Sequence, residues 1–273
     1  MRWRLWLVAV AGCGFQPPAA ALSVDAPVVA ADWGAPTALF PGSGDDDPTL
    51  TGDLLEIVFN RADDIYHAVR ASADVPFGQP SRVAELSTAS VETTPEMSYD
   101  GLTIYLSSNR PGGKGNNDIW VSTRASVAMP WSPPSHVDAL STTGNDTASA
   151  PSADGLAIVM NTNVTGNYDI YEATRAATST AWPTPVALAS VNTAGADDSP
   201  MLSADQLALY FDANRDGTDH LWMATRASTS EAFGSAAPIT SANTLGTEED
   251  PWISPDSRHL FFAANGTLYE VSR

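Results

Sequence analysis

Acidic side chains recur at one place in a repeated segment of the sequence, three residues before a position that is usually proline. Converging carboxylates can bind Ca²⁺ or another hard cation, or accept the basic end of a peptide. A pair of carboxylates can also act as acid and base in glycoside hydrolysis. Alternatively, an acid in every repeat can serve the fold, by accepting backbone N–H bonds or by pairing with a nearby arginine. The recurring acids are Asp45, Glu92, Asp146, Asp197 and Glu248.

The segment that carries these acids recurs along most of the chain. A representative copy, residues 92–124, reads ETTPEMSYDGLTIYLSSNRPGGKGNNDIWVSTR. The arginine that closes each copy is found at Arg70, Arg124, Arg175, Arg226 and Arg273, with spacings of 54, 51, 51 and 47 residues. A period near fifty residues with strand-like patterning is typical of β-propeller blades.

Each copy contains the signals of short antiparallel strands. The pairs Asp100-Gly101 and Asp154-Gly155 predict a tight hairpin turn between a first strand and an apolar second strand. A third strand holds an apolar-aromatic pair such as Ile119-Trp120. A fourth strand is expected after an aromatic and proline signal, at residues 137–140 and 186–188.

The two ends of the repeat array complement each other. After the fifth copy the chain ends at Arg273 with three strands, and the missing fourth strand has its counterpart at residues 33–40. An N-terminal strand that completes the C-terminal blade would remove two open sheet edges. We therefore predict an all-β protein whose residues 32–273 form a β-propeller of five four-stranded blades, with six blades as the alternative.

The propeller fold predicts where the recurring acids lie. The loop that enters the innermost strand of a blade opens at the rim of the central channel, so the five acids are expected to form an acidic ring at the channel mouth. The acids that follow them in the sequence would deepen the ring: Asp46, Asp47, Asp198, Glu249 and Asp250.

The repeat resembles the WD-repeat-like blade of TolB-type bacterial β-propellers. Residues 95–120 carry the motif P-x-x-S-x-D-G, a strand that ends in S-x-R, a Gly-rich turn and D-I-W, and the resemblance extends over residues 45–273. TolB-type propellers usually have six blades, so a count of five departs from that pattern. The resemblance implies a periplasmic or envelope location and protein binding rather than one particular chemistry.

The charge of the chain restricts its partners. Against 13 Lys and Arg there are 32 Asp and Glu, which gives a formal net charge of −19. Nucleic acid is excluded as a partner because phosphate binding requires a basic surface. The charge favours cations, a basic peptide or the basic face of an envelope protein. A monomer is expected.

Catalytic and metal-binding signatures give little support to an enzyme. The motifs G-x-S-x-G, H-E-x-x-H and the P-loop are absent, and the four histidines have no metal-ligand spacing. No cofactor or metal is therefore predicted. Calcium stays open, through the acidic ring or through residues 212–217, DANRDG, which resemble the opening of a calcium loop but lack its final glutamate.

The beginning of the chain has the features of an export signal. Arg2 and Arg4 precede an apolar run, and residues 10–13, VAGC, resemble the lipobox of bacterial lipoproteins. This predicts a signal peptide at residues 1–12, lipidation of Cys13 and a linker at residues 13–31. The expected location is the bacterial cell envelope, with the protein lipid-anchored in the outer membrane.

One turn departs from the repeat. Residues 111–117 form the longest turn between second and third strands, and they contain Lys114, the only lysine of the sequence. We expect this turn to lie on the same face as the acidic ring and Lys114 to contact a ligand. The sequence as a whole favours a non-catalytic, protein- or ligand-binding scaffold. The alternative is a propeller hydrolase that acts on carbohydrate or peptide with carboxylates at the channel mouth.

Overall fold

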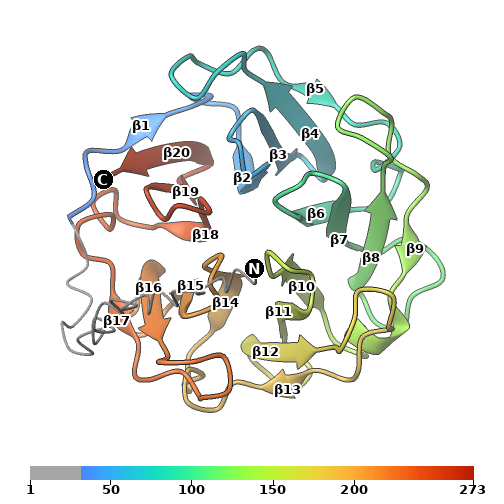
Figure 1. Ribbon diagram of the computed structural model, residues 1–273, viewed down its shortest axis with the longest axis vertical. Helices are drawn as coiled ribbons and strands as arrows, with labels where there is room; N and C mark the ends of the chain where they lie inside the picture. Colours follow the sequence, from blue (N-terminus) through green and yellow to red (C-terminus); the bar gives the residue numbers. More distant parts are fainter. Residues whose placement is uncertain (1–31) are drawn as a thin grey trace, which may run out of the picture. The chain divides into compact units, whose positions relative to one another are not determined.

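The computed structural model describes residues 32–273, and Asp32–Arg273 form one compact unit. Five antiparallel sheets of four strands stand in a ring as the blades of a β-propeller (Figure 1). The predicted fold class is confirmed, with five blades rather than six. The signal peptide, the lipidation of Cys13 and the linker concern residues outside the described part of the chain.

The strands of each blade follow one another outward from the centre of the ring. Blade 1 contains β2 (Asp45–Leu50), β3 (Glu56–Arg61), β4 (Asp64–Val69) and β5 (Ser81–Arg82). Blade 2 contains β6 (Glu92–Met97), β7 (Thr103–Ser108), β8 (Asp118–Thr123) and β9 (Ser135–His136). Blade 3 contains β10 (Asp146–Pro151), β11 (Ala157–Thr162), β12 (Asp169–Thr174) and β13 (Val186–Ala187). Blade 4 contains β14 (Asp197–Leu202), β15 (Ala208–Ala213), β16 (His220–Thr225) and β17 (Ala237–Pro238). Blade 5 contains β18 (Glu249–Ile253), β19 (His259–Ala264), β20 (Thr267–Ser272) and the N-terminal β1 (Thr37–Ala38).

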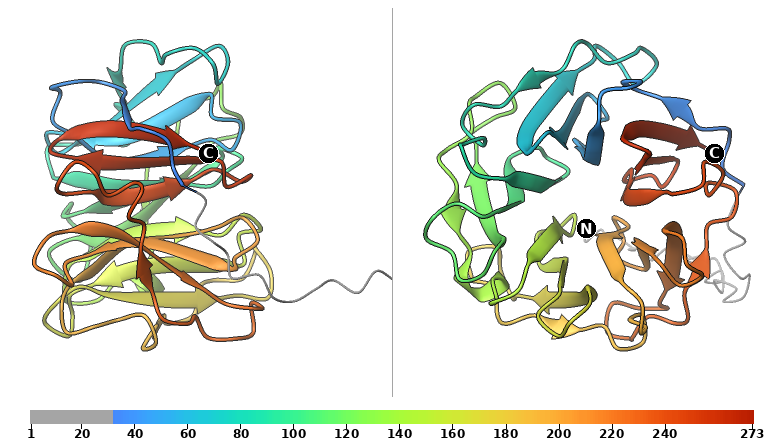
Figure 2. Two further views of the ribbon diagram at one scale, coloured as in Figure 1. Left: turned by 90° about the vertical axis from the view of Figure 1, so that its left-hand side faces the viewer. Right: turned by 180° about the vertical axis from the view of Figure 1, so that it is seen from behind.

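The N-terminal strand closes the ring as expected. Thr37 pairs with Glu270 and Ala38 with Tyr269, so that β1 lies beside β20 (Figures 1 and 2). Trp33 is buried, and the Arg273 guanidinium lies 4.5 Å from the centre of its ring. Blade 5 is therefore built from both ends of the propeller, and the pairing of β1 with β20 closes the ring.

The outermost strands are shorter than the sequence pattern suggested. Each has two residues, and in blade 2 the strand is Ser135–His136 rather than residues 137–140. Those residues instead enter a 3₁₀ turn, η1 (Asp138–Leu140), in which Leu140 is fully buried. The leucine anchors the turn between blades, so burial of its side chain outweighs continued strand pairing.

The arginine that closes each repeat belongs to the framework. In blade 2 the Arg124 Nε donates to the Gly101 carbonyl (2.6 Å) and the guanidinium lies 4.2 Å from the centre of the Trp131 ring. The same group reaches the preceding blade and pairs with Glu56 (2.5 Å). Equivalent stacking occurs in every blade, at Arg70, Arg175, Arg226 and Arg273. The closing arginine thus makes contacts within its own blade, and Arg124 also makes an ion pair with the preceding blade.

The propeller core lies between the blades, where apolar side chains of the second strands pack against the next sheet. Leu50, Phe59, Phe211 and Phe261 are fully buried members of the largest cluster. Across residues 32–273, no helix is long and apolar enough to cross a membrane.

Candidate functional site

The five recurring acids do not open into the channel. All five are fully buried, and none of them lines the central pocket described below. Each carboxylate instead binds the loop that precedes its own strand. The acids concerned are Asp45, Glu92, Asp146, Asp197 and Glu248.

Two of these acids illustrate the arrangement. Glu92 accepts hydrogen bonds from the backbone N–H (2.7 Å) and hydroxyl (2.6 Å) of Thr88, and it pairs with Arg110 (3.1 Å). Asp197 accepts from the N–H of Thr193 (2.6 Å) and pairs with Arg215 (2.7 Å). These contacts agree with the alternative that the recurring acid serves the fold. Its carboxylate accepts backbone N–H bonds and pairs with an arginine, and it thereby orders the start of its strand.

The residues that follow these acids meet at the centre of the ring instead. They line a pocket of about 310 Å³, enclosed by the innermost strands that Figure 1 shows around the centre. We call it the central acidic pocket. Its acidic lining residues are Asp46, Asp47, Asp198, Asp212, Asp219, Glu249 and Asp250, and its other lining residues are Thr94, Thr147, Tyr168, Ala196 and Ser199.

A backbone irregularity explains why neighbouring residues such as Asp46 and Asp47 both face the pocket. In a regular strand, successive side chains point to opposite faces. Here the register shifts between Asp46 and Thr49, and Asp47 has a φ of 53°. The same positive φ recurs at the equivalent position of every blade, including Asp250 (55°). A bulge of this kind re-aims side chains. The innermost strands of blades 1, 4 and 5 each present two consecutive residues to the pocket, whereas those of blades 2 and 3 present one each.

The blades contribute unequally to the charge. Blades 1, 4 and 5 supply all seven acids, whereas blades 2 and 3 supply Thr94, Thr147 and Tyr168. Hydrogen bonds between blades fix the acidic side: the Asp250 N–H donates to Asp212 (3.1 Å), and the Ser199 hydroxyl donates to Asp250 (2.5 Å). The pocket therefore has an acidic half and a neutral, hydroxyl-bearing half.

Enclosure of so many carboxylates changes their proton affinity. Burial, with further repulsion from Asp46 and Asp198, raises the pKa of Asp47 well above its usual range. Burial and the charge of Asp47 do the same to the pKa of Asp250. Burial raises the pKa of Asp198 to about 6. Loss of water and like charges act in the same direction, since both disfavour the ionised form.

A cation would find ligands in this pocket. Among the described residues, Asp46, Asp47 and Asp250 can each direct one carboxylate oxygen to within 4.8 Å of the others. Oxygen donors of this kind suit a hard cation or an ammonium group. The structure places two residues of the segment 212–217, DANRDG, in different surroundings. Asp212 faces the central acidic pocket, while Arg215 is bound to the buried Asp197.

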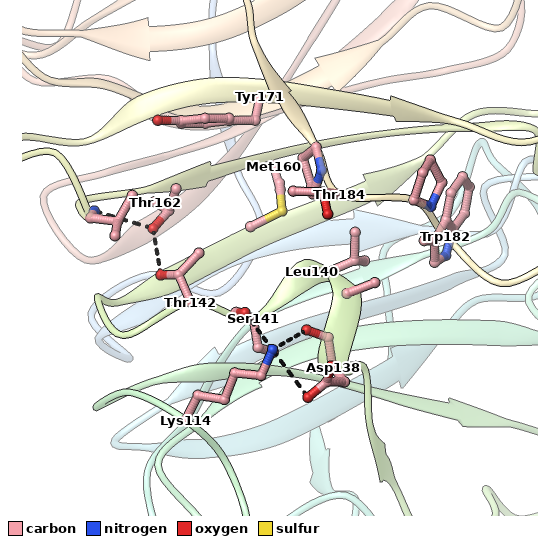
Figure 3. Close-up of a pocket in the computed structure, with 14 residues that line it drawn as sticks. Lys114, Asp138, Leu140, Ser141, Thr142, Met160, Thr162, Tyr171, Trp182 and Thr184 are labelled. Carbon is pink, nitrogen blue, oxygen red and sulfur yellow. Dashed lines mark hydrogen bonds and ion pairs between the residues drawn. The ribbon is translucent and has the colours of Figure 1, made fainter.

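Lys114 is held at the edge of a second pocket, between blades 2 and 3. Its Nζ donates to the Asp138 carbonyl (2.7 Å) and pairs with the Asp138 carboxylate (3.0 Å), as Figure 3 shows. The turn that carries it is packed against blade 3, since a Cβ on Gly115 would collide with the Gly144 carbonyl oxygen. Lys114 does not line the central acidic pocket, so the structure does not unite these two sets of predicted site residues.

Sequence reasoning missed Asp219, considered Asp212 only as the start of a calcium-loop motif, and treated the neighbours of the recurring acids as secondary. Asp212 has a signal in hindsight, because it aligns with Asn60 and Asn161 of other blades at the register position beside the bulge. Four of the five residues at this position are polar, the exception being Ala263, and polar residues are unusual in a buried second strand.

Solved structures of similar fold include proteins of several functions. TolB from Acinetobacter baumannii aligns with a TM-score of 0.53 and 14% identity over 83% of this chain, which spans about half (54%) of that protein. An endo-arabinase from Bacteroides thetaiotaomicron aligns with a TM-score of 0.60 and 15% identity, covering 83% of this chain and 93% of the enzyme. The α-L-arabinofuranosidase PaAbf62A from Podospora anserina aligns with a TM-score of 0.57 and 14% identity, covering 88% and 96%.

Sequence comparison adds no family to these likenesses. No protein-family model matches the chain, and no curated protein matches it. At 14–15% identity the structural likeness shows the fold alone, and it is shared by TolB-type and arabinan-related propellers.

Proposed function

We propose that this protein is a non-catalytic binding propeller of the bacterial cell envelope, and that its central acidic pocket takes a cationic group of its ligand. The observation that carries the proposal is the composition of the pocket: seven of its lining residues are acids and none is basic. Carboxylates enclosed without a counter-charge bind a cation strongly, because the ligand relieves their mutual repulsion.

The ligand we expect is an envelope protein or a basic peptide that inserts a lysine side chain or an amino terminus. A flat surface of acids would attract such a partner only weakly at physiological salt. A pocket with a desolvated acidic half attracts a cation more strongly than such a surface does. Its neutral half offers the hydroxyl groups of Thr94 and Thr147. The envelope location, with lipid attachment at Cys13, rests on the sequence pattern of residues 1–13 and on the TolB resemblance.

The test is recovery of a partner from solubilised membranes with the full-length protein as bait. The variant Asp47→Asn, Asp198→Asn, Asp250→Asn removes three charges from the pocket. Its matched control, Asp74→Asn, Asp216→Asn, Glu231→Gln, removes three charges from exposed positions. We expect the partner to be lost with the first variant and retained with the second. Equal recovery with both variants would remove the pocket as the binding site.

Calcium is the inorganic occupant that we propose for Asp46, Asp47 and Asp250. Binding to the folded state alone would raise the melting temperature by mass action. Titration with Ca²⁺ after treatment with a chelator tests this, and a melting temperature independent of Ca²⁺ would limit the site to organic cations.

A glycan hydrolase is the second candidate, because a carboxyl whose pKa lies near neutrality is suited to general acid catalysis. Asp198, with a pKa raised to about 6, is the acid in this reading. The likeness to two arabinan-related enzymes suggests arabinan oligosaccharides as the first substrates to assay. Loss of any measured hydrolysis in Asp198→Asn, with retention in Asp216→Asn, would support catalysis; absence of hydrolysis by the unmodified protein would exclude it for those substrates.

A further inference from the structure

An arginine recurs at the outer end of the second strand in three blades. Arg61 ends β3, and Arg110 and Arg215 lie two residues beyond β7 and β15. In each case the guanidinium approaches the recurring buried acid of its blade and an aromatic side chain of the third strand. The ring centres of Tyr66, Trp120 and Trp222 lie 5.0, 5.2 and 4.8 Å from the respective guanidinium carbons.

Two of these arginines also bridge to the preceding blade. Arg110 Nη2 donates to the Leu86 carbonyl (2.9 Å), and Arg215 Nη2 donates to the Val191 carbonyl (2.8 Å). Both carbonyls belong to the turn that leads from one blade to the next. Each guanidinium therefore fills one defined space, bounded by a carboxylate, an aromatic face and a carbonyl of the neighbouring blade.

Blade 3 has a valine at this position. Val164 lies two residues beyond β11, as Arg110 lies two beyond β7. The local backbone is the same, since the Val164 N–H donates to the Thr162 hydroxyl (3.3 Å) as the Arg110 N–H donates to the Ser108 hydroxyl (3.1 Å). The valine side chain is too short to reach inward, and the residue is 44% exposed.

A pocket of about 570 Å³ is found where the guanidinium would stand (Figure 3). We call it the blade 3 pocket. It offers counterparts of groups that hold Arg110: the ring of Tyr171 for Trp120, the turn residue Leu140 for Leu86, and the hydroxyl of Thr162 for that of Ser108, which accepts from Arg110 Nε (3.0 Å). Thr142 corresponds to Thr88, whose hydroxyl binds the buried Glu92 (2.6 Å). Its lining also includes Met160, Val164, Trp182 and Pro183, which make much of it apolar, and Lys114 and Asp138 at its edge.

The buried acid behind this pocket has no arginine partner among the described residues. Asp146 is held by the N–H (2.6 Å) and hydroxyl (2.8 Å) of Thr142. Burial raises the pKa of Asp146. A guanidinium brought to the Tyr171 face would stand close to this carboxylate, with Thr142 and Thr162 between them.

We propose that the blade 3 pocket binds the guanidinium of an arginine side chain supplied by a partner polypeptide. The planar cation would lie on the Tyr171 ring and donate to the Leu140 carbonyl and the Thr162 hydroxyl, as Arg110 donates to the Leu86 carbonyl (2.9 Å) and the Ser108 hydroxyl (3.0 Å). The aliphatic stem would pack on Met160 and Trp182. A volume of about 570 Å³ also admits part of the ligand's backbone.

Lys114 leaves this space open. Its Nζ is engaged at η1, by the carbonyls of Asp138 (2.7 Å) and Ser141 (3.3 Å), and its charge is paired with Asp138. The wall opposite Tyr171 is therefore neutral overall, and it does not repel an entering cation.

The test uses N-acetyl-arginine amide as the probe, with binding measured by chemical-shift perturbation of the Tyr171 and Met160 signals. The decisive variant is Val164→Arg, which supplies from the chain itself the group that blades 2 and 4 already contain. We expect this variant to fold, to be at least as heat-stable as the unmodified protein and to bind the probe at least tenfold more weakly. Val164→Ala should retain binding, and N-acetyl-lysine amide should bind less tightly than the arginine probe.

Two outcomes would overturn the proposal: no binding of the arginine probe to the unmodified protein, or unchanged binding after Val164→Arg in a variant that remains folded. The triple variant of the central acidic pocket separates this site from the proposed function. The arginine probe should still perturb Tyr171 in that variant, so either site can fail without the other.

Discussion

The hydroxyl of Ser199 in blade 4 donates a hydrogen bond to the carboxylate of Asp250 in blade 5, with an oxygen–oxygen distance of 2.5 Å. Both residues stand at the positive-φ position of their innermost strands. The contact joins two blades through an acid that has Asp47 as a further neighbour. Contacts between blades near the centre of the ring thus involve carboxyl groups that repel one another when they are ionised. The stability of the protein is therefore expected to depend on pH.

We predict that the protein is more stable at pH 5 than at pH 8. The pKa values of Asp47, Asp198, Asp212 and Asp250 are raised in the folded state. A raised carboxyl pKa contributes stability that is complete below the unfolded pKa, about 3.9, and is lost as pH rises through the folded pKa. For Asp198 that loss takes place between about pH 3.9 and about pH 6 and is complete above about pH 6.

Urea unfolding at pH 5, 6.5 and 8 tests this dependence. Carboxyls with lowered pKa, such as Asp154 and Asp256, act in the opposite sense, but their contribution is lost only as pH falls below about 4. A free energy of unfolding that is constant or increases from pH 5 to pH 8 would contradict the assignment of these acids to an enclosed pocket.

The substitutions Asp198→Asn and Asp154→Asn should have opposite effects at pH 8. The first replaces a carboxyl group whose pKa is raised to about 6 and which is therefore ionised in its buried site at pH 8. Removal of that charge is expected to increase the free energy of unfolding by an amount on the order of 2 kcal/mol. The second weakens a turn in which Asp154 accepts from the Ser152 hydroxyl (2.7 Å) and the Leu156 N–H (2.9 Å), and a loss of about 1 kcal/mol is expected. If urea unfolding shows that both substitutions change the free energy of unfolding in the same direction, the two carboxyls are not distinguished by their surroundings.

The repeat pattern was sufficient to predict the five-bladed ring and its closure, because strand period, turn residues and the missing final strand are all visible in local sequence. It was insufficient to predict which acids face the centre. Asp45 and Asp46 are adjacent and chemically identical, and the bulge that buries one and presents the other depends on a positive φ at Asp47, for which a non-glycine residue gives little sequence signal.

The blade 3 pocket was hidden for another reason. Its signal is the replacement of an arginine by Val164, since Arg110, Val164 and Arg215 each lie 18 residues after the recurring acid of their blade. The sequence does not show that this arginine fills a space between a carboxylate, an aromatic ring and a neighbouring blade, so the consequence of losing it is visible only in the structure.

Replacing Arg124 by lysine should destabilise the propeller far more than replacing Arg273. Arg124 is buried, donates to Gly101, pairs with Glu56 and stacks on Trp131. Lysine cannot reproduce the bidentate pairing or the planar stack, so a loss of about 2–4 kcal/mol is expected. Arg273 makes the equivalent bond to Ser257 (2.7 Å) and the stack on Trp33 from an exposed position.

For Arg273→Lys we therefore expect a loss below about 1 kcal/mol, because water can replace an exposed hydrogen bond. Urea unfolding of the two variants in parallel provides the comparison, with unchanged m-values as the sign that the ring still unfolds as one unit. Similar losses for both variants would mean that the framework role of these arginines lies in the stack and the carbonyl hydrogen bond, which the two share, rather than in the ion pair between blades that Arg124 makes with Glu56.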